Sequence, residues 1–422
     1  MKYILKLLLI VCSVVFLLTL PIIASCQVYK EGYSQFLGYQ LSDNKTKVSI
    51  PFEIHNNLII IPLVLNGIIP LNFILDTGVR TAILMDKNIS DILNLTYVRT
   101  ITLIGAAGGP GVAAHVAPNV SLSMPGVIGA GQALLVLDDD YLQLDAALGT
   151  KVHGIIGYEL FSRFVVEINY IENIVTLHEP KQFKPKRKFK AIPIKVEDTK
   201  PYITSFVVNK DNCKIESKLL IDTGASHSLL LHQESHEKII LPHKTIETSL
   251  GRGLGGDING YVGRIPEVNI SGFLIHSVIT SFPEKDTYSD IIMSTQRQGS
   301  IGGGILNRFD IVFDYHKEMI YVKKNKDFKR KSYFNMSGIE LKAEGQQLDK
   351  FIVIEVLKGS PGHQHNIKVG DEIIVANGMQ KDNLSLIYLN NLFKSRTNKK
   401  INLRIKRNGE VLKKSFRLKK II

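Results

Sequence analysis

The sequence predicts a mainly β protein that consists of two similar lobes followed by a smaller α+β domain. Three observations support this prediction. Short apolar segments separated by turn residues follow one another through most of the chain, which is typical of all-β architectures. One set of motifs occurs twice, in the same order and at nearly constant spacing. From about residue 334 the pattern changes, and a helical segment appears among the strands.

The repeat is clearest at two apolar segments that each run into the tripeptide Asp-Thr-Gly. The first tripeptide is Asp76-Thr77-Gly78 and the second is Asp222-Thr223-Gly224, so the two Asp residues are 146 positions apart (222 − 76). Further along, Ile156-Gly157 and Ile301-Gly302 precede matching closing segments and are 145 positions apart (301 − 156). The equal order and nearly equal spacing indicate a duplicated lobe.

Residues 1–26 are predicted to be a targeting segment. Lys2 and Lys6 precede an apolar run at 7–20, which is short for a transmembrane helix, and small residues follow it. The segment 23–26 resembles a bacterial lipobox, so two alternatives stay open: lipidation of Cys26, or ordinary cleavage near it. Either alternative predicts an exported protein of the periplasm or cell envelope, or a secreted one. Association with a membrane would then depend on the Cys26 lipid or on an uncleaved segment.

The two lobes are expected at 48–180 and 191–325. A polar linker at 27–47 precedes the first lobe, and a basic linker at 181–190 separates the two. In the first lobe we expect strands and one short helix, and the second lobe should repeat their order. The expected strands are 48–52, 58–65, 71–75, 98–103, 112–124, 133–137 and a hairpin at 164–177; the turn is Asn66-Gly67 and the helix 90–95.

The C-terminal domain is expected at 334–422, after a second basic segment at 326–333. Strands are expected at 351–356, within 369–378, and at 401–405, the last of which leads to a turn at Asn408-Gly409. A helix is expected at 384–393, with Leu384, Ile387 and Leu392 on one face.

Residues from about 48 to 324 resemble aspartic peptidases of the retropepsin/pepsin clan. In that clan two Asp-Thr-Gly loops face each other across a pseudo-twofold axis. An apolar–apolar–Gly segment passes beside each loop, as 155–157 and 300–302 would here. The C-terminal domain resembles a PDZ domain through Gly359-Ser360-Pro361 and the stretch 369–378. The whole chain is most similar to bacterial exported aspartyl proteases that carry a C-terminal PDZ domain.

The resemblance implies that Asp76 and Asp222 form a catalytic pair. Two adjacent carboxyl groups share one proton; one activates a water molecule and the other hydrogen-bonds the substrate carbonyl. This chemistry needs no metal and no cofactor. Thr77 and Thr223 are expected to cross-link the two loops through their hydroxyl groups. The other residues expected to support the pair are Gly78, Gly224, Ser226 and Arg80.

A glycine-rich hairpin in each lobe is expected to close over an extended peptide as a flap. Glycine lets a hairpin bend, and closure excludes water. The alternative is that both hairpins are only tight turns. The flap glycines are Gly105, Gly108 and Gly109 in the first lobe and Gly253, Gly255 and Gly256 in the second.

Four positions near the tripeptides depart from the family pattern. Val79 and Ala225 stand where acid-acting pepsins usually carry a hydroxyl that stabilises the ionised carboxylate. We therefore expect a pair that titrates higher than pepsin's and activity nearer neutral pH. Arg80 has two open interpretations, a charge beside the pair or a surface salt bridge. Ala82 stands where the second lobe has Ser228, so the support of the two loops is expected to be asymmetric.

Charge, cysteine content and the duplicated lobe indicate which partners and which oligomeric state to expect. The net charge is +13, but no nucleic-acid motif accompanies it, so we expect a solvated basic surface that is attracted to anionic membranes. Cys213 is the only cysteine outside the targeting segment, so no internal disulfide is expected. Two lobes in one chain complete the pair without a dimer, and a monomer is expected.

The function expected from these features is that of an endopeptidase whose PDZ domain recruits or positions protein substrates. The PDZ peptide-binding loop is expected at Ser337, Gly338 and Ile339. This loop lacks the fuller apolar-glycine signature, which argues against recognition of a free carboxylate. The alternatives are a catalytically silent envelope scaffold that binds peptides, or a zymogen-like state in which an N-terminal segment fills the cleft.

Overall fold

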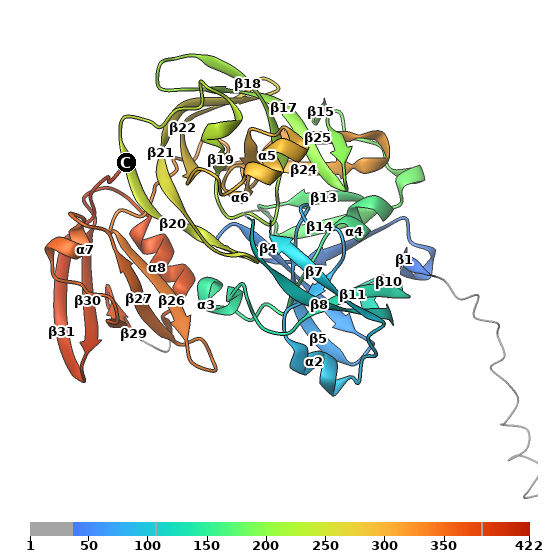
Figure 1. Ribbon diagram of the computed structural model, residues 1–422, viewed down its shortest axis with the longest axis horizontal. Coiled ribbons are helices and arrows are strands. Elements are labelled where there is room, and N and C mark those ends of the chain that lie inside the picture. Colours follow the sequence, from blue (N-terminus) through green and yellow to red (C-terminus); the bar gives the residue numbers. More distant parts are fainter. Residues whose placement is uncertain (1–36, 106–107, 381–382) are drawn as a thin grey trace, which may run out of the picture. The chain divides into compact units, whose positions relative to one another are not determined.

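Strands dominate the computed structural model, which describes residues 37–105, 108–380 and 383–422 (Figure 1). The expected targeting segment with Cys26, and the linker up to residue 36, lie outside the described residues. Within the described ranges, no helix is both long and apolar enough to cross a membrane.

Each lobe is built on one large sheet, and the two sheets have the same strand order. The order is β3-β4-β5-β12-β6-β11-β8-β7 in the first lobe and β16-β17-β18-β23-β19-β22-β21-β20 in the second. The structure therefore confirms the duplication that the motif spacing predicts.

The strands of the first sheet are β3 (Glu53–His55), β4 (Leu58–Leu65), β5 (Ile69–Leu75), β6 (Ile83–Leu84), β7 (Arg99–Gly105), β8 (Gly108–Val120), β11 (Gln132–Leu137) and β12 (Gly154–Ile156), with β9 (Leu122–Ser123) paired to β4. Those of the second are β16 (Lys195–Glu197), β17 (Lys200–Val208), β18 (Lys214–Ile221), β19 (Leu229–Leu231), β20 (Thr245–Gly253), β21 (Gly256–Ile270), β22 (Phe273–Pro283) and β23 (Gly299–Ile301).

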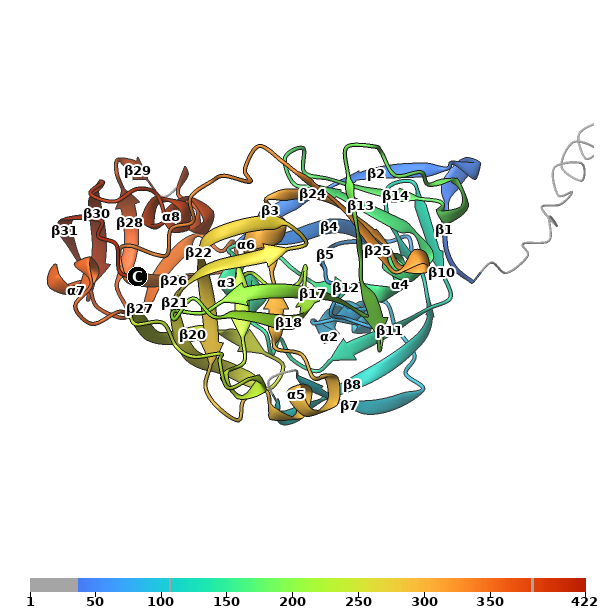
Figure 2. The same ribbon diagram turned by 90° about the horizontal axis from the view of Figure 1, so that it is seen from above.

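A six-stranded sheet joins the two lobes in the order β15-β25-β24-β13-β14-β2 (Figure 2). At its centre the closing segments of the two lobes pair antiparallel, with Val166 opposite Phe313 and Ile168 opposite Ile311. Exchange of the two lobes maps one of these pairs onto the other. The pseudo-twofold axis that relates the lobes therefore passes between these two strands. The strands are β2 (Lys47–Pro51), β13 (Val165–Asn169), β14 (Ile174–His178), β15 (Lys190–Pro193), β24 (Phe309–Asp314) and β25 (Met319–Lys324).

The C-terminal domain has a sheet of its own, in the order β26-β27-β28-β30-β31, with β29 paired to β28. Its separate apolar core includes Phe351, Phe393 and Phe416. The strands are β26 (Ile339–Glu344), β27 (Lys350–Val356), β28 (Glu372–Ala376), β29 (Met379–Gln380), β30 (Lys400–Arg407) and β31 (Glu410–Arg417). Its helices are α7 (Pro361–Gln364) and α8 (Leu386–Phe393).

Short helices complete the two lobes. They are α2 (Lys87–Ile92), α3 (Leu144–Leu148), α4 (Tyr158–Arg163), α5 (Ser289–Thr295) and α6 (Gly303–Leu306), with 3-10 turns η1 (Ser42–Asn44), η2 (Pro180–Gln182), η3 (Gln233–Ser235) and η4 (Tyr315–Lys317). Helix α2 lies close to the expected helix at 90–95. The other α-helices of the lobes were not predicted, because segments of four to seven residues are too short to show a helical period.

Two expectations about local structure are wrong. The linker expected at 27–47 contains β1 (Gly38–Leu41), which pairs with β10 (Val127–Ala130) and belongs to the first lobe. In α8 the buried residues are Leu386, Leu389, Leu392 and Phe393, and Ile387 is only half-buried. The helix begins one residue after Ser385, whose side chain caps it by accepting from the Tyr388 amide, and this start sets the face.

Phe161 on α4 anchors the junction of the lobes. It is fully buried, its ring lies 5.2 Å from the Phe313 ring and 5.5 Å from the Tyr315 ring, and both partners belong to the second lobe. Replacement by Ala removes these contacts and leaves a cavity.

We therefore expect Phe161→Ala to lower the free energy of unfolding by about 3–5 kcal/mol, as measured by urea denaturation. Val411→Ala, at an exposed site on β31, is the control and should change it by less than about 0.5 kcal/mol. Equal effects of the two substitutions would contradict this role for Phe161.

Candidate active site

The two Asp-Thr-Gly loops are locked together by their threonines. The Thr77 amide donates to Thr223 Oγ1 at 3.0 Å, and the Thr223 amide donates to Thr77 Oγ1 at 3.1 Å. Each hydroxyl then donates across to the strand before the other loop: Thr77 to the Ile221 carbonyl at 2.6 Å, and Thr223 to the Leu75 carbonyl at 2.8 Å. Both threonines are buried, so these bonds do not compete with water.

This lock brings Asp76 and Asp222 together. Asp76 Oδ1 accepts from the Gly78 amide at 2.6 Å, and Asp222 Oδ1 accepts from the Gly224 amide at 3.0 Å. A Cβ atom on Gly224 would lie within 2.5 Å of Asp76 Oδ1, so the loop must carry glycine for the opposite carboxyl group to fit. Each glycine thus orients one carboxyl group, as expected for a paired site.

Burial and mutual repulsion hold a proton on the pair. Burial, followed by the negative charge of Asp222, raises the pKa of Asp76 to about 7. Burial also raises the pKa of Asp222, but the positive charge of Arg297 opposes this effect. The field of Arg297 therefore favours a proton on Asp76 and a negative charge on Asp222. The direction agrees with the expectation from Val79 and Ala225 that the pair titrates high.

The positive charges that act on the pair are those of Arg297, on Asp222, and of Lys200, on Asp76, and not that of Arg80. Arg80 is exposed, and its Nη1 lies 3.7 Å from Oδ1 of Asp198, which is also exposed. Of the two interpretations of Arg80, the surface salt bridge is correct. The expectation that Arg80 supports the aspartate pair is wrong. Arg297, by contrast, is 5% exposed. Its sequence position, 75 residues after Asp222 (297 − 222), gives no local sign of this proximity.

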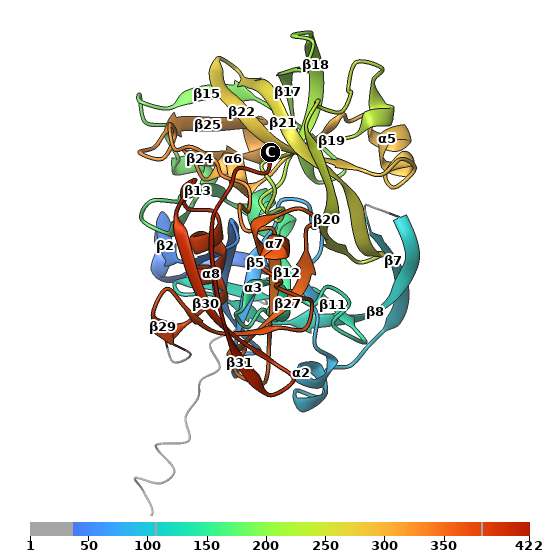
Figure 3. The same cartoon turned by 90° about the vertical axis from the view of Figure 1, so that its left-hand side faces the viewer.

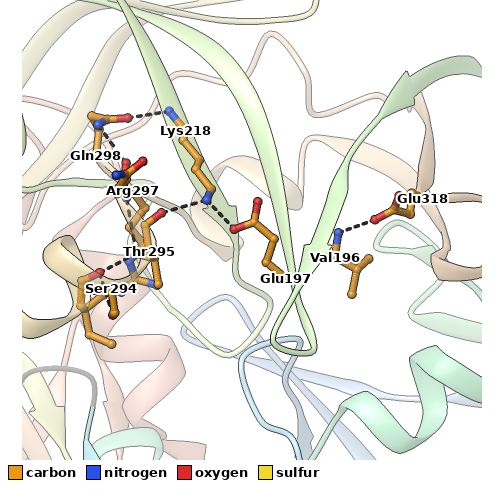
Figure 4. Close-up of polar contacts among 10 residues, drawn as sticks. Val196, Glu197, Lys218, Ser294, Thr295, Arg297, Gln298 and Glu318 are labelled. Carbon is orange, nitrogen blue, oxygen red and sulfur yellow. Dashed lines mark hydrogen bonds and ion pairs between the residues drawn. The ribbon is translucent and has the colours of Figure 1, made fainter.

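The backbone around Arg297 is fixed by an exchange of hydrogen bonds with β18 (Figure 4). The Gln298 amide donates to the Lys218 carbonyl at 2.9 Å, and the Lys218 amide donates to Gln298 Oε1 at 2.8 Å. The Lys218 ammonium bonds Glu197 at 2.5 Å and the Thr295 carbonyl at 2.8 Å. These contacts hold the segment after α5 against the strand that leads to Asp222.

The tips of the two glycine hairpins meet (Figure 3). A Cβ atom on Gly109 would lie 2.6 Å from the Gly255 carbonyl oxygen, and one on Gly105 would lie 3.0 Å from the Gly255 amide. Gly108 also approaches Gly255, while Gly253 and Gly256 flank the second tip. Contact of this closeness between two tips is geometrically suited to paired flaps in a closed state.

Asn57 is a supporting residue that the sequence did not reveal. Its amide nitrogen donates to the Ser226 carbonyl at 2.8 Å, and its side-chain oxygen accepts from Asn307 at 3.0 Å. Ser226 thus contributes to the site through its backbone. Asn57 ties the β3–β4 turn of the first lobe to the loop of Asp222, and nothing in its neighbourhood in the sequence indicates this.

The asymmetry expected at Ala82 is also present. The Ala82 amide donates to Glu159 Oε1 at 2.8 Å, and burial raises the pKa of Glu159. In the second lobe Gly304 stands at the place of Glu159, and a Cβ atom on it would lie 2.4 Å from the Ser228 hydroxyl oxygen. The second lobe therefore has no carboxyl group at this position.

His227 and His115 each have a hydrogen-bond partner within the fold. His227 Nε2 lies 3.0 Å from the Ser300 hydroxyl, and burial lowers its pKa to about 4. His115 contacts Asp138 and Thr100, each at 2.9 Å. Among the described residues there is no cluster of three or more His, Cys, Asp or Glu that could hold a metal ion.

Comparison with known families agrees with this geometry. Residues 206–303 match the family model of aspartyl proteases, and residues 322–418 match that of PDZ domains. The chain contains an aspartyl protease domain and a PDZ domain. The first match includes Asp222, the second glycine hairpin and Ile301-Gly302; the first lobe shares the strand order of the second. No curated protein matches the chain.

In the expected peptide-binding loop of the PDZ domain, the backbone amides already donate hydrogen bonds to nearby side-chain oxygens. Asn335 Oδ1 accepts from the Ser337 amide at 3.0 Å, the Ser337 hydroxyl at 2.7 Å and the Gly338 amide at 3.2 Å. The Ile339 amide lies 3.1 Å from the Ser337 hydroxyl oxygen and donates to it. Because the loop amides already have an oxygen acceptor, the geometry agrees with the expectation that a free carboxylate is not recognised there.

The hydrogen bonds between Thr77 and Thr223 should contribute measurably to the free energy of unfolding. Thr223→Val removes a hydroxyl donor and an acceptor and leaves the buried Thr77 amide without its partner. We expect unfolding free energy to fall by about 2–4 kcal/mol in urea denaturation. Thr46→Val, at an exposed threonine, is the control and should have almost no effect. An unchanged free energy of unfolding for Thr223→Val would show that packing alone holds the loops together.

The raised pKa of Asp76 also predicts a pH dependence of stability. An acid with a folded pKa near 7 and an ordinary unfolded value contributes stability below about pH 4 that is lost as pH rises through 7. Asp76→Asn cannot ionise, so its stability relative to wild type should increase between pH 4 and 8, by roughly 2–4 kcal/mol. Asp139→Asn, at an exposed carboxylate, should show no such trend. A pH-independent difference for Asp76→Asn would contradict the raised pKa.

Proposed function

We propose that the protein is an aspartic endopeptidase, in which a water molecule between Asp76 and Asp222 attacks the peptide carbonyl. The observation that carries the proposal is the adjacent pair itself, which the threonine lock fixes; desolvation and mutual repulsion raise the pKa of Asp76 to about 7. With Arg297 acting on Asp222, the ionised Asp222 accepts a proton from water and the protonated Asp76 donates a hydrogen bond to the carbonyl. The proton is then delivered to the leaving nitrogen.

In the proposed enzyme, the paired hairpins act as flaps over the substrate. Their glycine tips close over the site from both lobes, so a bound peptide would be enclosed and bulk water excluded. Both halves of the site come from one chain, which supports a monomeric enzyme. From the targeting segment in the sequence we also propose that the enzyme is exported.

The PDZ domain, in this proposal, positions protein substrates for the protease domain. Strand β26 is at the edge of the PDZ sheet, where an extended peptide can add as another strand. Helix α3 of the first lobe packs against β26, so a peptide would add along this edge after α3 has moved. Recognition would use main-chain hydrogen bonds and side-chain contacts, because the loop amides are already bonded to Asn335 and Ser337.

Cleavage of a complex peptide mixture, read by mass spectrometry between pH 3 and 8, tests the activity. Wild type should generate new termini, with activity falling as pH rises past about 7 because the shared proton is lost. Asp76→Asn and Asp222→Asn should each abolish them, while Asp139→Asn should not. Equal silence of wild type and both variants, with peptide binding retained, would favour the scaffold alternative. A maximum below about pH 3 would contradict the high-titrating pair.

A further inference from the structure

We propose that the two lobes form side-chain subsites of opposite character, and that buried Arg297 makes the second-lobe subsite select an acidic substrate side chain. The first-lobe subsite, at the corresponding position, takes an apolar side chain. This inference rests on the proposed peptidase function and adds the substrate class to it.

The registers of the two sheets establish which residues correspond. In the first lobe Ile74 of β5 pairs with Ile155 of β12, and in the second Leu220 of β18 pairs with Ser300 of β23. Across these sheets, Ile60 faces Ile74 and Tyr202 faces Leu220, with Tyr202 thus corresponding to Ile60. Ser300 likewise occupies the place of Ile155.

Backbone hydrogen bonds extend the correspondence to the neighbouring strand. The Met85 amide donates to the His153 carbonyl at 2.9 Å, and the His232 amide donates to the Gln298 carbonyl at the same distance. His232 therefore occupies the place of Met85. Arg297 immediately precedes Gln298 as Val152 precedes His153, so Arg297 occupies the place of Val152.

These positions lie on the catalytic side of each sheet. Successive side chains along a strand point to opposite faces, so Ile74 lies on the face of Asp76 and Leu220 on the face of Asp222. In the first lobe this face carries a distinct apolar cluster, separate from the main core. Its members include Ile60, Ile74, Ile83, Met85, Val152 and Ile155, together with Val112 and Ala114 from flap strand β8.

The apolar cluster also meets the opposite flap. Leu254, at the tip of the second hairpin, packs against it. The cluster therefore lies between the catalytic sheet and the flaps, where side chains of an extended peptide would enter when the flaps open. With its Val, Ile and Met side chains, it is suited to an apolar substrate side chain.

The second lobe replaces four residues of this cluster with polar side chains. Tyr202, His232, Ser300 and Arg297 occupy the places of Ile60, Met85, Ile155 and Val152. His232 is 3% exposed and Arg297 is 5% exposed. Both nitrogen atoms of the His232 ring and Nε of Arg297 are buried without a hydrogen-bond partner among the described residues. Buried donors that lack a partner destabilise the fold, so their presence indicates a ligand.

The missing ligand has the chemistry of a carboxylate. The Arg297 side chain bonds the Tyr202 hydroxyl, but its Nε has no partner, and no ion pair of Arg297 is found among the described residues. A guanidinium is always charged and matches a carboxylate with two parallel hydrogen bonds. Burial, followed by the charge of Arg297, lowers the pKa of His232 to about 3, so His232 stays neutral and adds a hydrogen-bonding group without repelling Arg297. The His232 ring lies 4.7 Å from the Tyr288 ring, so Tyr288 belongs to the same cluster of side chains.

Cleavage-site profiling tests this assignment. For wild type above pH 5, where Asp and Glu are ionised, cleavage sites should be enriched in Asp or Glu at one fixed position near the scissile bond and in apolar residues on the other side of it. Arg297→Met keeps much of the side-chain length but removes the charge, and should abolish the acidic enrichment. On a matched peptide pair, it should lower the ratio of kcat/KM for the Glu peptide to kcat/KM for the Gln peptide about 30-fold, because loss of the field on Asp222 affects both peptides alike. Arg80→Met, the matched surface control, should preserve the wild-type profile.

The controls separate this inference from the proposed activity. If wild type cleaves without an acidic preference, or if Arg297→Met retains the preference, the subsite assignment is wrong while the peptidase stands. If cleavage requires a free C-terminal carboxylate and disappears on amidation, Arg297 binds the peptide terminus and the side-chain assignment is again overturned. Thermal unfolding of Arg297→Met verifies that the variant is folded.

Binding gives a second readout that does not require turnover. Peptides in which a reduced bond replaces the scissile amide should bind wild type at least tenfold more tightly with Glu than with Gln at the acidic position, by calorimetry. Arg297→Met should bind both equally. Equal binding by wild type would overturn the assignment even if the protein proved catalytically silent.

Discussion

The reciprocal bonds between Thr77 and Thr223 are the constraint on which the rest of the structure depends. Two buried carboxyl groups repel each other when both are ionised, and desolvation adds to their instability. They stay adjacent only because the loops beneath them are fixed to each other and to the strands that precede the opposite loop. The inter-lobe sheet and the Phe161 contacts then resist separation of the lobes, so fold stability is used to hold an unfavourable pair in place.

The two lobes have kept their backbone pattern while their chemistry has diverged. His153 and Gln298 illustrate both facts: each side chain accepts a hydrogen bond from the amide at the matching place, Asn72 or Lys218, although the residue types differ. Conserving such backbone bonds preserves the register, and the register decides which positions face the catalytic pair. Substitutions at those positions can then alter the site without disturbing the sheet. The change from Val152 to Arg297 is of this kind.

Sequence alone predicted the features that rest on local patterns or on the repeat. The adjacent aspartates, the threonine lock, the paired hairpins and the two-lobe plan all follow from short motifs that occur twice. The position of Arg297 was missed because it depends on the pairing of β18 with β23, which brings together residues about 80 positions apart. Closeness to Asp76 in the sequence suggests a role for Arg80 beside the pair, but its side chain is exposed and forms an ion pair with Asp198. Closeness in sequence is a poor guide to charge contacts at a site built from several strands.

The same repeat nevertheless contained a usable signal for Arg297. Once the closing segments are aligned at their offset of 145, Arg297 falls on Val152, and a charged residue stands where the other lobe has an apolar one. In a duplicated fold, positions that are buried in both copies but differ in polarity are candidates for specificity, since burial of a charge is destabilising unless something binds it. Arg297 satisfies this criterion in the structure, and under the proposed assignment its field on Asp222 would join the choice of substrate to the protonation of the aspartate pair. A carboxylate bound to Arg297 would weaken that field, which would raise the pKa of Asp222 and move the shared proton toward a more even distribution.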